Sequence, residues 1–135
     1  MNNGIRDLVN YRLSCAKEDL KSAIKNLEEN QLRIANNRAY YSIFHSMRTI
    51  LALEQQDFKK HSAVRAYFNQ HYIKTNIFPP NLYKLISNAE IVRNESDYDD
   101  FYIASYEQTK EQIESAKLIL DLVEKYINNI EYEQR

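Results

Sequence analysis

The sequence predicts an all-α protein, an up-and-down bundle of four long helices and one shorter helix. One glycine and two prolines in 135 residues leave too few turn formers for a protein built from many short strands. Apolar residues recur at steps of three and four over most of the chain, which is the spacing of one face of a helix. The length fits a single domain over residues 1–135.

The first half of the chain predicts three helices. Leucine and alanine recur among charged residues over 5–29, and the second helix is expected over about 34–54. Ser62 is a natural N-cap for a third helix that ends near Tyr72 and is shorter than the others. Short polar segments separate the three, as expected for helices that fold back on one another.

The second half begins with Pro79 and Pro80, which stop any helix that enters them. A fourth helix is expected over about 81–93. The segment 94–100 is polar, acidic and rich in turn formers, and it is predicted to be a loop.

Ser105 is expected to open the last helix, with Gln108 three residues later as the partner in a capping box. A continuous apolar edge then runs to Ile130. Residues 131–135 are expected to fray.

One stretch of the second helix, residues 36–45, organises the chain. Tyr40 and Phe44 fall on one apolar stripe, while Arg38, Tyr41 and His45 recur on a neighbouring stripe. A helix with apolar bulk on most of its faces is usually central. Polar groups within such a helix must find partners or serve a site.

Composition excludes several classes of protein. A net charge of −1, from 18 basic and 19 acidic residues, gives no bulk charge to drive nucleic-acid binding. The single cysteine, Cys15, permits no disulfide within one chain. No secretory-type run and no apolar stretch of about 20 residues occur, so we expect a cytoplasmic protein that does not contact a membrane.

The segment 58–89 is locally basic and aromatic. It contains no Asp or Glu, and phenylalanines and tyrosines are interleaved with its cations. Basic groups for phosphates and rings for base stacking are typical of single-stranded RNA binding. The alternative is that the rings are core and the lysines line a solvated face. The cations are Lys59, Lys60, Arg65, Lys74 and Lys84.

The following segment, 90–100, is acidic and is broken only by Arg93. It lacks the glycine and the terminal glutamate of a calcium-binding loop. We interpret it as a loop whose aspartates cap helices and pair with Arg93. The three histidines have neither the spacing of a zinc site nor a cysteine companion, so we predict no metal and no cofactor.

Four blocks follow one another in a fixed order along the chain. They are Asn37-Arg38-Ala39-Tyr40-Tyr41 with Phe44-His45, then Lys60-His61-Ser62, then Phe68, and finally Ser96-Asp97-Tyr98-Asp99. Together these blocks resemble the HEPN domain family, and in particular its small stand-alone bacterial and archaeal members. The likeness covers about residues 8–126.

The resemblance implies a helical bundle that dimerises and acts on RNA or nucleotides. Many members are metal-independent ribonucleases, often toxins paired with a minimal nucleotidyltransferase antitoxin, or parts of antiviral defence. Their site is an arginine followed four to six residues later by histidine. Arg93 is expected to be that arginine, but no histidine occurs in 94–100. The nuclease motif is therefore degenerate, although Arg93 retains the chemistry to bind phosphate.

Three functions remain open from the sequence. The first is a dimeric module that binds RNA, a nucleotide or a partner protein without cleaving. The second is an endoribonuclease toxin with a non-standard site at Arg38 and His45. The third is a structural partner of a nucleotidyltransferase. Candidate catalytic residues are Arg38, His45 and Arg93, and candidate RNA or nucleotide contacts are Tyr41, Lys60, His61, Arg65, Asp97 and Tyr98.

Overall fold

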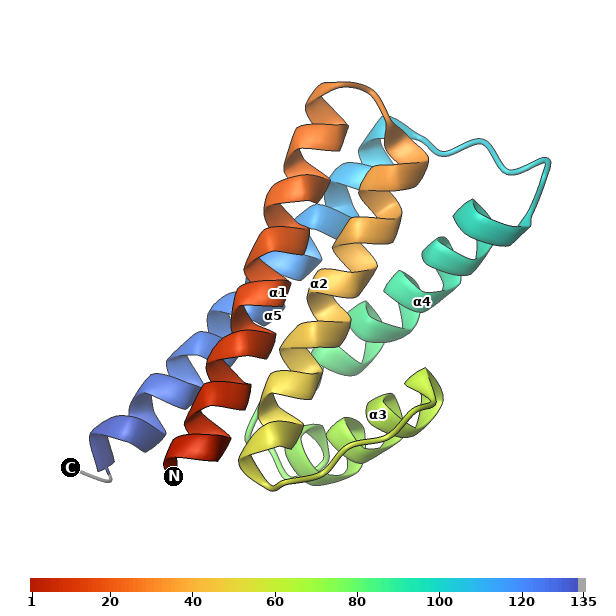
Figure 1. Cartoon of the computed structure of the whole chain (residues 1–135). Helices are drawn as coiled ribbons and strands as arrows, with labels where there is room; N and C mark the ends of the chain where they lie inside the picture. Colours follow the sequence, from red (N-terminus) through yellow and green to blue (C-terminus); the bar gives the residue numbers. More distant parts are fainter. Residues whose placement is uncertain (134–135) are drawn as a thin grey trace.

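The computed structural model describes residues 1–133, which form a helical bundle (Figure 1). This confirms the predicted all-α class. One short π-helical turn, η1 (Asn69–Ile73), follows the third α-helix directly. The α-helices are α1 (Asn3–Glu28), α2 (Leu32–Leu53), α3 (His61–Phe68), α4 (Leu82–Tyr98) and α5 (Tyr106–Glu133).

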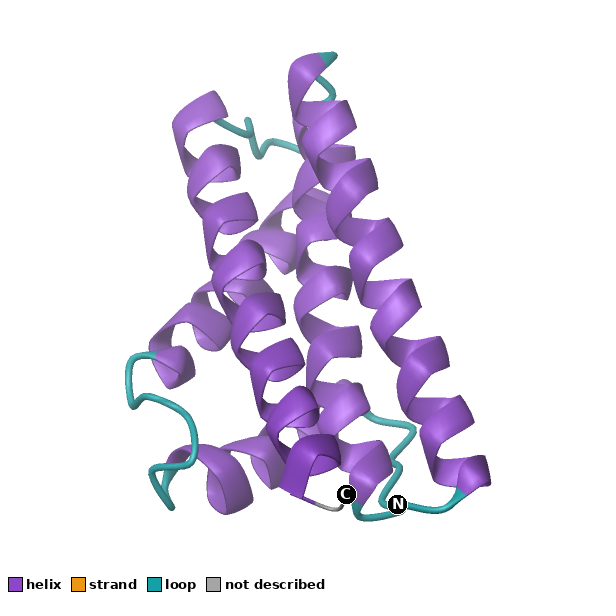
Figure 2. Cartoon of the chain, turned by 90° about the vertical axis from the view of Figure 1, so that its left-hand side faces the viewer, coloured by secondary structure: helices purple, strands orange, loops and turns teal. Residues whose placement is uncertain are grey.

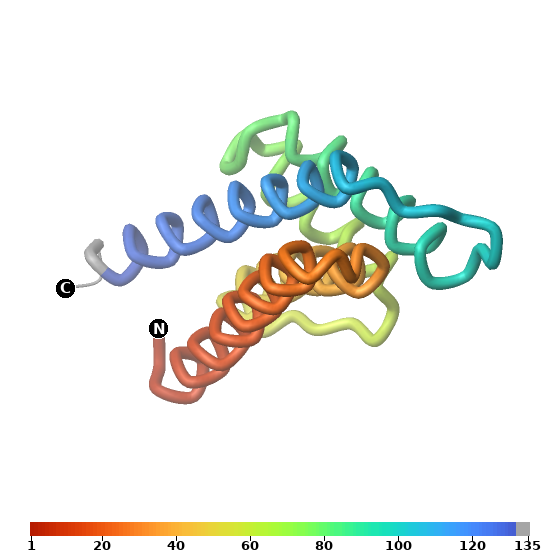
Figure 3. Tube along the Cα trace, turned by 90° about the horizontal axis from the view of Figure 1, so that it is seen from above, coloured from red at the N-terminus to blue at the C-terminus, as the bar shows by residue number. Residues whose placement is uncertain are grey.

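Helix α2 is the centre of the bundle, as its apolar composition predicts. Of its 22 residues, 13 are buried. It packs against α1, α3, α4 and α5, and α1 runs antiparallel beside it (Figures 1 and 3). The short helix α3 crosses the end of the bundle at which both termini lie (Figure 2). Side chains that project from α2 toward α3 and α4 are therefore held on a rigid element.

Helix α4 is longer than predicted. It continues to Tyr98, so the prediction of a loop over 94–100 is wrong for most of that segment. The polar side chains of its last turn have partners that favour the helix. Ser96 is buried and accepts a hydrogen bond from Asn36 Nδ2 at 3.2 Å, and Asp97 forms an ion pair with the residue four positions earlier.

The third helix also differs from its prediction. It begins at His61, and Lys60 occupies the N-cap position, so Ser62 lies inside the helix and does not cap it. After Phe68 the chain widens into η1 instead of continuing as an α-helix. This places His61 at the very start of α3, next to α2.

Side chains cap two of the helices. Asn2 Oδ1 accepts from the backbone N–H of Ile5 at 2.8 Å, and Ser105 Oγ accepts from that of Gln108 at 3.1 Å. The predicted N-cap of the last helix is thus confirmed. The reciprocal half of the capping box does not form, because Gln108 Oε1 accepts a hydrogen bond from the Tyr102 hydroxyl.

The end of α5 is more regular than expected. The helix continues through Glu133, although fraying was predicted from residue 131. The last two residues of the predicted frayed tail, 134 and 135, lie outside the described residues.

Candidate functional site

A group of aromatic and cationic side chains gathers where α2, α3 and α4 meet. Its members are Arg93, Tyr40, Tyr41, Tyr98 and His61, and we call them the Arg93 cluster. The tyrosines at positions 40 and 41 come from the central helix, and the histidine comes from the start of α3. The extension of α4 beyond position 93 brings Tyr98 into the cluster.

The guanidinium of Arg93 lies among three tyrosine rings. Its central carbon is 5.2 Å from the ring centre of Tyr40, 5.5 Å from that of Tyr41 and 5.4 Å from that of Tyr98. Arg93 Nη2 also donates to the hydroxyls of Tyr41 at 3.2 Å and Tyr98 at 3.4 Å. Cation–π attraction and these hydrogen bonds hold the charge in one position.

Asp97 also orients Arg93, through an ion pair with its guanidinium. Its Oδ2 atom lies 3.0 Å from Arg93 Nε and accepts from Asn37 Nδ2 at 2.9 Å. The predicted pairing of an acidic residue with Arg93 is therefore present. A carboxylate in this position offsets part of the guanidinium charge, so Asp97 positions Arg93 and does not itself offer a contact to an anion.

His61 is fixed by hydrogen bonding and by stacking. Its Nδ1 atom is 2.8 Å from the hydroxyl of Tyr40, and its ring stacks on Phe44 with 4.0 Å between ring centres. Arg65 Nη1 donates to the same Tyr40 hydroxyl at 3.4 Å. The Tyr40 hydroxyl oxygen can accept from Arg65 while its proton bonds to His61 Nδ1. In that arrangement a neutral imidazole carries its hydrogen on Nε2.

The surroundings of His61 favour this neutral ring. Burial lowers the pKa of His61 below its ordinary value, and the nearby charges of Arg93 and Arg65 lower it further. Burial also raises the pKa of Tyr40, so that residue remains a phenol. At neutral pH the ring of His61 is therefore uncharged.

Arg65 and Lys60, two further predicted RNA or nucleotide contacts, lie in different environments. Arg65 forms an ion pair with Glu90 at 2.7 Å as well as its bond to Tyr40. Lys60 is exposed, and its ammonium has no hydrogen bond or ion pair within residues 1–133. Glu90 did not figure among the candidate residues, since its partner lies 25 residues away in the sequence.

Arg38 and His45 meet at a carboxylate on α1. Arg38 Nη1 is 3.0 Å from Asp19 Oδ1, and His45 Nε2 is 3.7 Å from Asp19 Oδ2. The guanidinium of Arg38 also donates twice to Asn37 Oδ1 and lies 5.2 Å from the ring centre of Tyr41. The predicted pair is therefore brought together, through a residue that the sequence analysis did not single out.

Asp19 carried a signal that could have identified it. It lies on the side of α1 that includes the buried residues Ala16 and Ala23, where a carboxylate requires a partner. Burial raises the pKa of Asp19 and lowers that of His45, although each opposes the shift of the other through its charge. His45 Nδ1 is buried and has no hydrogen-bond partner.

The Arg93 cluster offers a convergent set of donors. Tyr41 and Tyr98 accept from Arg93, which leaves their own hydroxyl protons to donate outward. The guanidinium of Arg93 completes the set. Such a site is suited to the oxygens of a phosphate group.

Two features are absent from the part of the chain that the structure describes. No group of three or more His, Cys, Asp or Glu side chains could hold a metal ion. No helix there is long and apolar enough to cross a bilayer.

Comparison with known proteins places this geometry in a family. The HEPN domain model matches residues 9–126, and the chain belongs to the HEPN family. It is 31% identical to a UPF0332 protein of Thermotoga maritima over 123 residues, which cover 91% of this chain and 93% of that protein. It is 30% identical over 135 residues to the protein named "Putative toxin MJ0605" of Methanocaldococcus jannaschii, with 96% of each chain covered.

Proposed function

We propose that the chain binds a phosphate group of a nucleotide or of single-stranded RNA at the Arg93 cluster and does not cleave it. The observation that carries the proposal is the donor set around Arg93: its guanidinium and the two tyrosine hydroxyls that contact it. In this module Arg93 supplies the charge, and the aromatic rings keep it in place.

The guanidinium can accept a new anionic partner. Its contacts with Tyr98 and with Asn94 Oδ1, at 3.4 and 3.5 Å, are long for hydrogen bonds. Charge-assisted bonds to a phosphate are shorter and roughly twice as strong as neutral ones. A phosphate that replaces these two long contacts therefore gains energy without disturbing the ion pair of Arg93 with Asp97.

The hydrogen bonding of His61 supports binding over cleavage. General-base catalysis needs an unprotonated nitrogen within reach of the reacting hydroxyl. One of the two ring nitrogens of His61, Nδ1, is already hydrogen-bonded to the Tyr40 hydroxyl at 2.8 Å. Only Nε2 remains for a ligand.

The alternative site at Arg38 and His45 is less suited to chemistry. Arg38 directs three of its nitrogens at Asp19 and Asn37, and the Nδ1 atom of His45 is buried. This arrangement supports a polar packing cluster between α1 and α2.

The module is proposed to act as a homodimer in a toxin–antitoxin or defence system. The name of the relative from M. jannaschii supports a toxin-like role. Two apolar side chains after α4, Phe101 and Ile103, are 93% and 89% exposed and support a protein interface at this end of the bundle. A minimal nucleotidyltransferase antitoxin remains a proposed partner on the strength of the family.

An RNA cleavage assay tests the proposal. Labelled single-stranded RNA is incubated with the wild type and with the His45→Ala and Arg93→Ala variants, with and without EDTA. The proposal predicts intact RNA in every lane, with a complex that is retained on a filter by the wild type and lost by Arg93→Ala. RNA cleavage that survives EDTA and disappears in His45→Ala would instead establish a ribonuclease with a displaced site.

A further inference from the structure

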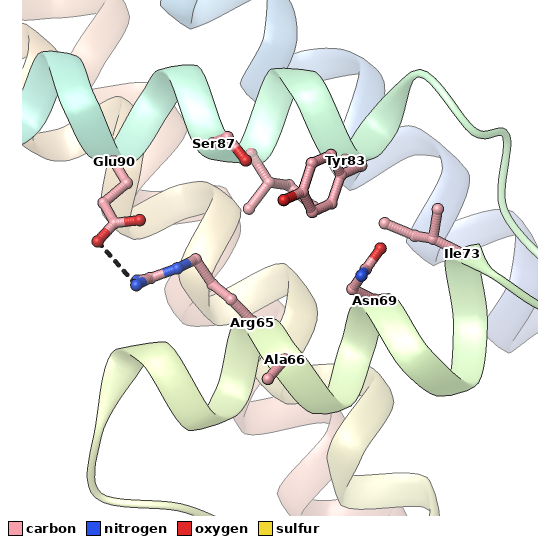
Figure 4. A pocket seen from close by; sticks show the side chains of 8 residues that line it. Arg65, Ala66, Asn69, Ile73, Tyr83, Ser87 and Glu90 are labelled. Atoms are coloured by element: carbon pink, nitrogen blue, oxygen red, sulfur yellow. Dashed lines mark hydrogen bonds and ion pairs between the residues drawn. The ribbon is translucent and has the colours of Figure 1, made fainter.

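A pocket of about 300 Å³ lies between α3 with η1 on one side and α4 on the other (Figure 4). Its apolar wall includes Ile73 and Ile86, which are each 5% exposed. Tyr83 also lines the pocket, from α4, and is 56% exposed. The volume is at the small end of ligand pockets and fits a small molecule.

Polar groups with unused hydrogen-bonding capacity line the same pocket. Within residues 1–133 the side chains of Asn69, Ser87 and Tyr83 make no hydrogen bond. Glu90 uses Oε1 for its ion pair with Arg65, so Oε2 remains an acceptor. An amide, a hydroxyl and a carboxylate oxygen around an apolar slot can contact both donors and acceptors on the edge of a flat ring.

Arg65 joins this pocket to the Arg93 cluster. Its side chain lines the pocket and binds Glu90 there, while Nη1 donates to the hydroxyl of Tyr40. Tyr40 in turn contacts His61 and lies under the guanidinium of Arg93. The two sites are therefore separated by a single side chain.

We propose that this pocket takes the base of the nucleotide whose phosphate binds the Arg93 cluster, and that it selects bases with an exocyclic amino group. This inference deepens the proposed function and rests on it. The ring of Tyr83 stacks on one face of the base, and Ile73 and Ile86 contact the other face. The carboxylate of Glu90 accepts from the amino group, and Asn69 contacts the neighbouring ring atoms.

The charge of the pocket explains the expected selectivity. A carboxylate oxygen attracts the amino hydrogens of adenine, guanine or cytosine. Uracil has no exocyclic amino group and presents a carbonyl oxygen where cytosine carries its amino group, and an acceptor that faces an acceptor is unfavourable. Uridine monophosphate is therefore the discriminating ligand.

Titration calorimetry with the whole chain tests the inference. The ligands are AMP, GMP, CMP and UMP, with ribose 5-phosphate as the probe that has no base and adenosine as the probe that has no phosphate. We expect UMP to bind at least several-fold more weakly than the other three nucleotides. Tyr83→Ala should weaken AMP binding about tenfold and leave ribose 5-phosphate unchanged. Tyr106→Ala, which removes another half-exposed tyrosine, is the matched control.

Glu90→Gln gives a second readout, because the amide presents a donor as well as an acceptor and should reduce the discrimination against UMP. If ribose 5-phosphate binds as tightly as all four nucleotides and Tyr83→Ala changes nothing, the base pocket is wrong and the phosphate site stands. If ribose 5-phosphate does not bind but adenosine does, the phosphate site fails, and the proposal that one nucleotide occupies both sites fails with it. Failure of every ligand to bind overturns both.

Discussion

At the scale of single residues, the charge of Arg93 is set by what surrounds it. The tyrosine rings stabilise the guanidinium without neutralising it, whereas Asp97 offsets part of its charge at 3.0 Å. Asp97 therefore has two effects: it fixes the position of Arg93, and it weakens the attraction of the guanidinium for an anion. Substitutions at Asp97 can separate these two effects.

Asp97→Asn should tighten phosphate binding. The amide keeps an oxygen that can accept from Arg93 Nε, so the guanidinium stays oriented while a repulsive negative charge is lost. We expect the affinity for ribose 5-phosphate to rise about threefold or more, measured by calorimetry at low salt. Asp100→Asn is the control, because it makes the same charge change at an exposed position nearby. Weaker binding by Asp97→Asn, or an equal gain in both variants, would contradict this account.

His45 should make the stability of the fold depend on pH. Its folded-state pKa is lowered from the ordinary value of 6.5, mainly by burial, so the unfolded chain binds more protons as the pH falls below 6.5. The free energy of unfolding is then highest above pH 6.5 and decreases on acidification. His61 acts in the same direction, and the raised pKa of Asp19 acts in the opposite one.

Urea denaturation at pH 8 and pH 5.5 measures this dependence. The wild type should have the lower midpoint at pH 5.5. In His45→Gln the loss between the two pH values should be smaller, because the glutamine does not titrate. An unchanged loss in the variant would show that His45 does not contribute.

At the scale of helices, the residues that follow a helix set how the chain turns toward the next one. Asn30, Gln55 and Asn76 have positive φ angles of 58°, 56° and 64°. Asparagine tolerates this left-handed conformation, but for a glutamine it is strained. Gln55 follows the last residues of α2 and turns the chain toward α3.

Gln55→Gly should therefore stabilise the protein, because glycine adopts a positive φ without a steric penalty. A gain of about 1 kcal/mol corresponds to a rise in Tm of roughly 2–4 °C for a chain of this size. Thermal denaturation followed by circular dichroism measures it. Gln56→Gly, one residue later, should have no such benefit, and a gain of equal size there would argue against relief of strain at Gln55.

The sequence pattern predicted the helices well and their ends less well. Periodicity located all five α-helices, because each one buries an apolar face. The loop predicted over 94–100 failed because its polar residues bond to α2, as the contact of Ser96 with Asn36 illustrates. A sequence window contains no information on such a partner 60 residues away.

The candidate site was predictable to a similar degree. Arg93, Tyr41 and His61 were all selected as candidates, and the fold brings them together from three helices. Asp19 and Glu90 were not selected, because their roles depend on which helices are neighbours. The resemblance and the residue types selected side chains that the fold brings together, whereas tertiary contacts determine their pairings.

At the scale of the whole molecule, the exposed apolar segment after α4 is expected to be covered by a second copy. Phe101→Asp should convert a dimer to a monomer, because a charge placed in an apolar interface must be desolvated. Light scattering coupled to size-exclusion chromatography reports the mass. Leu118→Asp, at a 41% exposed position on α5, should leave the dimer intact. A wild type that is monomeric at micromolar concentration would contradict the proposed dimer.

The affinity of Arg93→Ala for a labelled single-stranded RNA, measured by fluorescence anisotropy over a range of salt concentrations, tests the central claim most directly. The matched control is Arg6→Ala, which removes an arginine from the start of α1. The account predicts that Arg93→Ala binds about tenfold more weakly than the wild type and loses roughly 0.7 from the slope of log affinity against log salt, while Arg6→Ala behaves as the wild type does. Equal affinities and slopes for all three proteins would show that Arg93 does not bind phosphate.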